Sequence, residues 1–136
     1  MSAGVLTMPA ALALELTAPL PGFPAHRDYA LVAADGDGLL FWLQSIDPAG
    51  PRFLAVPAAA FFPGYAPPLA PAVCAELGLG GGDQPAVYCL VTVPGGDIRK
   101  ATANLLAPIA VNPQTRRARQ IVLRDGSHPI RQPLRR

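Results

Sequence analysis

The chain has 136 residues, enough for one domain with a core of its own. Hydrophobic residues make up 51% of it and charged residues only 15%, which excludes a chain that is disordered throughout. The 17 prolines and 13 glycines exclude a bundle of long helices, because each interior proline removes a helix hydrogen bond and obstructs the turn before it.

Charge is segregated along the chain. Residues 1–98 carry two basic and eight acidic side chains, a net charge of −6, whereas residues 99–136 carry nine basic and one acidic side chain, a net charge of +8. This separation predicts an acidic and a basic surface, each able to serve as a docking patch. A basic end that only solubilises the chain is the alternative.

The first half of the chain predicts short strands joined by turns. Leucines alternate with other residues over 12–16, the pattern of a half-buried strand, and further strands are predicted over 29–33, 39–46 and 52–56. An Asp-Gly-Asp-Gly sequence at 35–38 predicts a hairpin turn, because Asp-Gly pairs tolerate the positive φ that tight turns need. The aromatic, Pro-rich segment 61–68 can form neither a regular helix nor a central strand.

The second half predicts one helix, over 71–77, with a proline at its start and Gly78 as its C-cap. Strands are predicted over 86–93 and 119–123, and Pro108 predicts a bulge or an edge within the apolar run 102–111. We therefore predict a mainly β fold. It is a single compact antiparallel β-barrel-like domain with one short helix, spanning residues 1–125, followed by a basic, flexible tail over 126–136.

The sequence offers no set of side chains for catalysis or for a metal. His26 and His128 have no second ligand at metal spacing, and Cys74 and Cys89 do not form a C-x-x-C pair. Both cysteines are predicted to be small buried hydrophobic residues. No nucleophile, base and orienting group come together, so we predict no enzymatic activity, no metal and no cofactor.

The same reading predicts a cytoplasmic protein without membrane contact. No apolar stretch reaches the ~18 residues of a membrane span, and no basic residue precedes Arg27 as a secretory signal requires. Two cysteines suit a reducing compartment. We expect a monomer when no partner is bound.

Four segments resemble, in this order, the FliW family of flagellar assembly factors. They are Gly-Phe-Pro at 22–24, Phe-Trp-Leu-Gln-Ser at 41–45, Phe-Phe-Pro-Gly-Tyr-Ala-Pro at 61–67 and Thr-Ala-Asn-Leu-Leu-Ala-Pro-Ile at 102–109, followed by Arg-Gln-Ile-Val-Leu at 119–123. The resemblance covers about residues 12–134. It implies a β-barrel-like domain without enzymatic activity and two protein partners, flagellin and the RNA-binding translational repressor CsrA. By binding CsrA away from its RNA surface, such a protein relieves repression of flagellin translation during flagellar assembly.

Five candidate partner-binding residues are aromatic or lie beside aromatic residues. Phe61, Phe62 and Tyr65 occupy a Pro-rich loop that cannot easily hide all three rings, although loop aromatics also plug barrel ends. Trp42 and Gln44 alternate with Phe41 and Leu43, so one pair faces the core and the other faces outward.

Three further candidates are polar. Asn104 either satisfies backbone groups at the bulge next to Pro108 or binds a partner. Asp28 and Asp47 lie beside turns, are expected to be exposed, and would attract the basic CsrA together with Asp35 and Asp37.

A direct RNA-binding protein is the alternative function. It would use Arg116, Arg117, Arg119 and the basic tail over 131–136. The sequence lacks aromatic residues interleaved with these arginines, on which single-stranded nucleic acid stacks. For this reason we expect no direct binding of nucleic acid.

Overall fold

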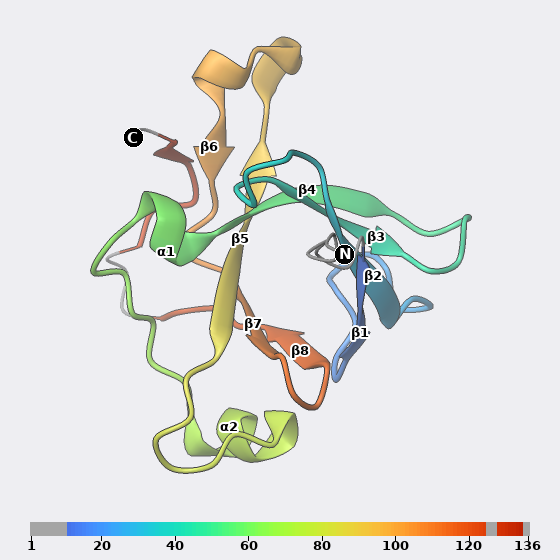
Figure 1. Ribbon diagram of the computed structural model, residues 1–136, viewed down its shortest axis with the longest axis vertical. Helices are drawn as coiled ribbons and strands as arrows, with labels where there is room; N and C mark the ends of the chain where they lie inside the picture. The colour runs from blue at the N-terminus through green and yellow to red at the C-terminus, as the bar shows by residue number, and fades with distance from the viewer. Residues whose placement is uncertain (1–10, 125–127, 135–136) are drawn as a thin grey trace, which may run out of the picture.

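The computed structural model describes residues 11–124 and 128–134 (Figure 1). Its strands are β1 (Ala11–Leu16), β2 (Asp28–Ala33), β3 (Phe41–Ser45), β4 (Arg52–Pro57), β5 (Ala86–Thr92), β6 (Thr102–Ala103), β7 (Ile109–Asn112), β8 (Arg117–Gln120) and β9 (Gln132–Pro133). Two α-helices, α1 (Ala58–Phe61) and α2 (Pro71–Leu77), and two 3₁₀ turns, η2 (Pro94–Gly96) and η3 (Ile98–Lys100), complete the described elements.

The strands form one sheet that closes on itself. Their order is β4-β3-β2-β1-β8-β7-β5-β6-β9, and a second pairing, of β4 with β5, closes seven of them into a barrel while β6 and β9 extend beyond it. The predicted mainly β, barrel-like fold is confirmed. All the ladders are antiparallel except that of β1 with β8, which is parallel.

One core fills the barrel. Strand residues point alternately to the two faces of a sheet, so every second residue of each strand faces inward. The large inward side chains that are almost completely buried are Leu16, Tyr29, Leu43, Ile109 and Val111. Phe41 packs against this core and Leu43 belongs to it. Of the two alternating pairs of β3, Phe41 and Leu43 therefore face the core, and Trp42 and Gln44 face outward.

A second core lies outside the barrel wall formed by β4 and β5. Val56 and Cys89 point outward from these strands, are fully buried, and pack with Ala103 and Leu105. Helix α1 and the aromatic loop after it cover this cluster, and α1 is an element that the sequence analysis did not predict. Its four residues give too short an apolar pattern to indicate a helix.

Strand bounds differ from the predictions where side chains or prolines compete with the ladder. The third strand begins at Phe41 instead of residue 39, because the Asp35 carboxylate accepts the N–H groups of Leu39 and Leu40 at 3.1 and 3.2 Å. The apolar run 102–111, for which Pro108 predicts a bulge or an edge, is instead split into β6 and β7 by an irregular segment that contains Pro108. The last predicted strand, 119–123, is instead β8 at Arg117–Gln120, and residues 121–123 bond to the irregular segment 106–108.

The described part of the predicted tail is attached to the barrel. Within 126–136 the structure describes residues 128–134, of which Gln132–Pro133 form β9 against β6. The N–H of Leu134 donates to the carbonyl of Ala101 at 3.1 Å, and Leu134 packs on the second core. Pairing with β6 and the packing of Leu134 therefore hold a segment for which the sequence predicts fraying. Residues 126, 127, 135 and 136 lie outside the described residues.

Helix α2 has the predicted bounds, with Pro71 in its first turn and Gly78 at its C-cap in the left-handed region, φ +79°. Its last carbonyl, that of Leu77, accepts hydrogen bonds from Asn112 Nδ2 and Thr115 Oγ1, both at 2.9 Å. Because a helix end leaves carbonyls without partners, these two bonds fix α2 to the β7–β8 hairpin.

Candidate partner-binding face

The outer surface of β1, β2 and β3 carries an acidic row. Because Leu14, Leu16 and Tyr29 face the core, Glu15 and Asp28 face outward, and the two are direct cross-strand partners. The backbone N–H of Ile46 donates to the carbonyl of Asp28 at 2.9 Å, so Ile46 continues the row. Its side chain is 57% exposed. Like charges placed directly opposite destabilise a sheet, and the exposed Arg117 of β8, the register partner of Glu15 on its other side, offsets part of this cost.

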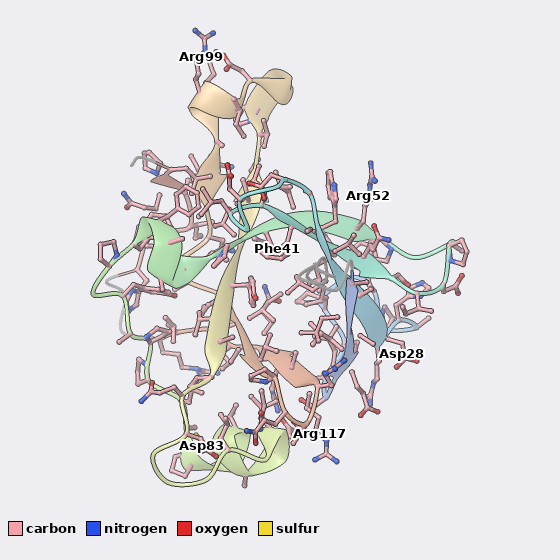
Figure 2. The ribbon with its side chains drawn as sticks, in the orientation of Figure 1. Asp28, Phe41, Arg52, Asp83, Arg99 and Arg117 are labelled. Carbon is pink, nitrogen blue, oxygen red and sulfur yellow. The ribbon has the colours of Figure 1, made fainter. Side chains whose placement is uncertain are left out.

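The same face holds Trp42 and Gln44, which are outward and half-buried. The Arg52 guanidinium carbon lies 4.2 Å from the centroid of the Trp42 ring, in a cation–π contact from the neighbouring strand. Gln44 is the register partner of Arg52. Asp28 and Arg52 lie on the same side of the molecule and Phe41 lies nearer its centre (Figure 2).

Asp47 lies at the end of the acidic row, in the turn after β3. Its Oδ1 accepts the N–H of Ala49 at 2.9 Å, and its Oδ2 lies 3.9 Å from Nδ1 of His26. Asp28 and Asp47 line one shallow pocket together with His26, Ile46 and the cationic Arg27. The structure thus brings four of the predicted residues, Trp42, Gln44, Asp28 and Asp47, onto one continuous surface.

The aromatic loop lies elsewhere. Phe61, Phe62 and Tyr65 are half-buried and pack against the second core. The Tyr65 hydroxyl donates to the carbonyl of Leu105 at 2.6 Å, and its ring meets that of His128 edge-on at 5.5 Å. The rings cover the outside of the barrel wall, whereas the predicted alternative was that they plug a barrel end.

Asn104 satisfies the backbone, as the first of its two predicted roles requires. Its Oδ1 accepts the N–H groups of Leu106 and Ala107 at 3.0 and 3.1 Å, in the segment between β6 and β7. Asn104 precedes Leu105 of the second core, and it is not part of the face that holds Trp42.

The sequence analysis missed Glu15, Ile46 and Arg52 as residues of this face. The alternation of Leu12, Leu14 and Leu16 could have placed Glu15 outward, and Arg52 follows from the alternation of β4. The position of Ile46 depends on its bond to Asp28 across the hairpin, which the strand bounds predicted from sequence did not reveal.

The arginines of the alternative function are partly engaged by the protein itself. Arg119 Nη1 donates to Glu76 Oε2 at 2.7 Å and Arg117 Nη1 donates to the Glu76 carbonyl at 3.3 Å. The Arg119 bond, with a second from Thr17, holds the pKa of Glu76 below its usual range. Two of these arginines are therefore held at this end of the barrel, Arg119 by an ion pair and Arg117 by a bond to a carbonyl of α2.

Over residues 11–124 and 128–134 no helix is long and apolar enough to cross a bilayer. Within the same ranges no three His, Cys, Asp or Glu side chains gather as metal ligands would. Burial raises the pKa of Cys89 to about 12, consistent with the predicted role of a small buried hydrophobic residue, whereas Cys74 is half-buried.

A family model described as "FliW protein" matches residues 2–134 of the chain. The chain belongs to the FliW family. It is 38% identical over 121 residues to the flagellar assembly factor FliW of Symbiobacterium thermophilum, covering 88% of this chain and 87% of that protein. The FliW of Moorella thermoacetica is 35% identical over 115 residues, covering 85% of this chain and 73% of that protein.

The fold has a counterpart among solved structures. A crystal structure of the flagellar assembly factor FliW superimposes with a TM-score of 0.81 at 24% identity, covering 90% of this chain and 85% of that one. This likeness establishes the same barrel. It agrees with the fold that the resemblance of the sequence motifs to the FliW family implied.

Proposed function

We propose that this FliW protein is a protein-binding regulator of flagellar assembly, which binds flagellin and CsrA and so relieves repression of flagellin translation. Family membership supports the flagellar role. One observation carries the choice of surface for CsrA: Glu15 and Asp28 stand opposite each other on the outside of the barrel, next to the exposed Ile46. A basic partner would place a cation beside Asp28, as Arg117 of β8 does beside Glu15.

The proposed face has the composition of a binding surface. Trp and Arg are enriched among residues that dominate binding energy, and Trp42 and Arg52 stack on each other at its centre. Glu15, Asp28 and Asp47 form a polar rim on one side of them. CsrA binds RNA and is therefore basic, so the rim would steer its approach.

Titration calorimetry with purified CsrA tests the proposal. The double variant Glu15→Gln, Asp28→Asn removes the acidic row, and we expect weaker binding, mainly through a slower association rate. Asp83→Asn, an acid removed from the loop after α2, is the matched control and should bind as the wild type does. Affinity of the wild type should fall as salt is raised, because the Debye length shrinks from ~10 Å at 0.1 M to ~3 Å at 1 M.

Two results would contradict this function. The first is an affinity for CsrA that stays flat with salt and is equal in the double variant. The second is retention of RNA by this chain alone in a filter assay at physiological salt, which would favour the direct RNA-binding alternative. A pull-down with flagellin tests the second partner independently. We propose the cytoplasm as its place of action, because CsrA and newly synthesised flagellin would be met there.

A further inference from the structure

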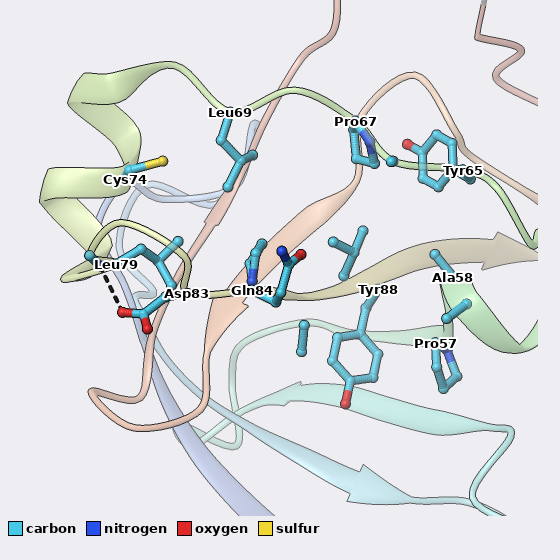
Figure 3. Close-up of a pocket in the computed structure, with 16 residues that line it drawn as sticks. Pro57, Ala58, Tyr65, Pro67, Leu69, Cys74, Leu79, Asp83, Gln84 and Tyr88 are labelled. Carbon is cyan, nitrogen blue, oxygen red and sulfur yellow. Dashed lines mark hydrogen bonds between the residues drawn. The ribbon is translucent and has the colours of Figure 1, made fainter.

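A groove beside the aromatic loop lies away from the face proposed for CsrA. It has a volume of about 520 Å³, within the range of ligand sites. The start of β5 forms one wall and the segment 65–69 forms the other, and Figure 3 shows the Leu69 side chain reaching from that segment towards β5. Ala58 of α1 and Cys74 of α2 lie at its two ends.

The wall made by β5 is a sheet edge. Strand β4 ends at Pro57, opposite Tyr88, and the chain then turns into α1. In the ladders of the described residues, β5 before Tyr88 is therefore paired on one edge only, with β7. The other edge of this stretch faces the groove, because Pro85, Ala86 and Val87 line it.

The direction of the backbone groups follows from one hydrogen bond. The N–H of Asn104 donates to the carbonyl of Leu90 at 2.9 Å, so the polar groups of Leu90 point to the side of β6 and β7. Successive residues of a strand direct their N–H and C=O to alternate edges. Val87, three residues earlier, thus points both groups towards the groove.

The lining chemistry defines what fits beside this edge. Alanine, proline and leucine side chains make up most of it, and Asp83 is its one carboxylate, at the end next to α2. The Asp83 Oδ2 accepts the N–H of Gly80 at 2.7 Å, which holds the carboxylate in place (Figure 3). An apolar occupant with a single cationic group at that end complements the groove in polarity and in charge.

We propose that this groove receives an extended apolar segment of a partner protein, added to β5 as a strand, with a lysine or arginine beside Asp83. Strand addition of this kind takes affinity from main-chain hydrogen bonds and specificity from side-chain pockets. All the ladders of β5 are antiparallel. A segment that continues the direction of β4 runs antiparallel to β5, so its C-terminal end lies next to Asp83. The inference does not depend on the proposed binding of CsrA or flagellin.

The probe is an acetylated and amidated hexapeptide, Val-Ala-Val-Ala-Val-Lys, titrated into the full chain labelled with ¹⁵N. We expect amide shifts at Val87 and its neighbours and slower hydrogen exchange of the Val87 N–H. The same peptide with glutamate in place of lysine should bind about two- to fivefold more weakly, the size of a partly exposed ion pair. The peptide should also slow alkylation of Cys74, which lines the groove.

Two variants and a control isolate the site. Ala59→Trp, at an exposed position of α1 that lines the groove, fills it and should abolish the shifts. Asp83→Asn should remove the preference for lysine, while Asp37→Asn, an exposed acid in the β2–β3 turn, should preserve it. The proposal is overturned if the peptide leaves Val87 unshifted, if the shifts fall on the face of Trp42, or if Ala59→Trp, folded by its thermal transition, binds as the wild type does.

Discussion

The hydroxyl of Tyr65 donates a hydrogen bond of 2.6 Å to the carbonyl of Leu105, 40 residues further along the chain. This bond ties the aromatic loop to the segment between β6 and β7, at a point where no ladder holds the two together. The Tyr65 ring packs on the same cluster as Phe61 and Phe62. The loop is thereby part of the second core, and its contribution to stability can be separated from a role in binding.

Tyr65→Ala should lower the free energy of unfolding by ~2–4 kcal/mol, because it removes a large packed ring and leaves the Leu105 carbonyl without this donor. Tyr65→Phe keeps the ring and should cost only about 1 kcal/mol. Thermal and denaturant unfolding measure both. Flagellin affinity is measured beside them: if Tyr65→Ala loses affinity while its melting temperature is unchanged, Tyr65 is a binding anchor and the packing account is wrong.

Tyr29→Phe should stabilise the protein. The Tyr29 side chain is fully buried in the barrel, and within the described residues its hydroxyl has no hydrogen-bond partner, while burial raises its pKa. An unsatisfied buried polar group costs about 1–3 kcal/mol, so removing the hydroxyl should raise the midpoint of urea unfolding. Tyr88→Phe, at a half-buried ring, is the comparison. A loss of stability in Tyr29→Phe would mean that a water inside the barrel bonds to the hydroxyl.

Local pattern was enough to predict some elements of this fold. The alternating leucines of 12–16 gave β1 within one residue, and Pro71 with Gly78 set both ends of α2. Both features are encoded within a few neighbouring residues. The prediction that Asn104 satisfies the backbone near Pro108 succeeded for the same reason, since the N–H groups that donate to its Oδ1 lie two and three residues away.

Features that depend on contacts between distant segments could not be predicted from the sequence. The parallel pairing of β1 with β8 joins Leu16 to Ala118, about a hundred residues apart, and no local pattern indicates that pairing. The second core is assembled from α1, β5 and the segment after β6, so the aromatic loop could be read equally well as exposed or packed. Likewise, the sequence predicted only part of the candidate face. Alternation along the strand made Trp42 a candidate, but its contact with Arg52 depends on the register of β3 and β4.

Glu76→Gln should make the stability of the protein less dependent on pH in the acid range. Glu76 accepts hydrogen bonds from Arg119 and Thr17, at 2.7 and 2.9 Å, which hold its pKa below the usual value. A depressed pKa in the folded state adds stability above the ordinary Glu pKa of ~4.3, and that stability is lost as the pH falls through the folded value.

At pH 7 the variant should therefore be less stable than the wild type. The loss should be no more than about 1 kcal/mol, because the side chains of Arg119 and Glu76 are 38% and 34% exposed and solvent screens their attraction. The difference should shrink towards zero as the pH is lowered below ~4. Urea unfolding at pH 7, 5 and 3.5 measures it. A difference that stays constant over this range would show that the carboxylate does not contribute through its charge.

Trp42→Ala should weaken CsrA binding by about 2 kcal/mol or more, close to thirtyfold, if the outer face of β2 and β3 is the contact surface. Trp42 is the only tryptophan in the chain, so its fluorescence should also change when CsrA binds to the wild type. Arg52→Ala removes the stacked cation and should give a smaller loss. Both variants are compared with Leu43→Ala, whose side chain faces the core: it should lower the melting temperature by many degrees while its folded fraction keeps its affinity. Unchanged affinity and fluorescence at Trp42 would move the CsrA site away from this face.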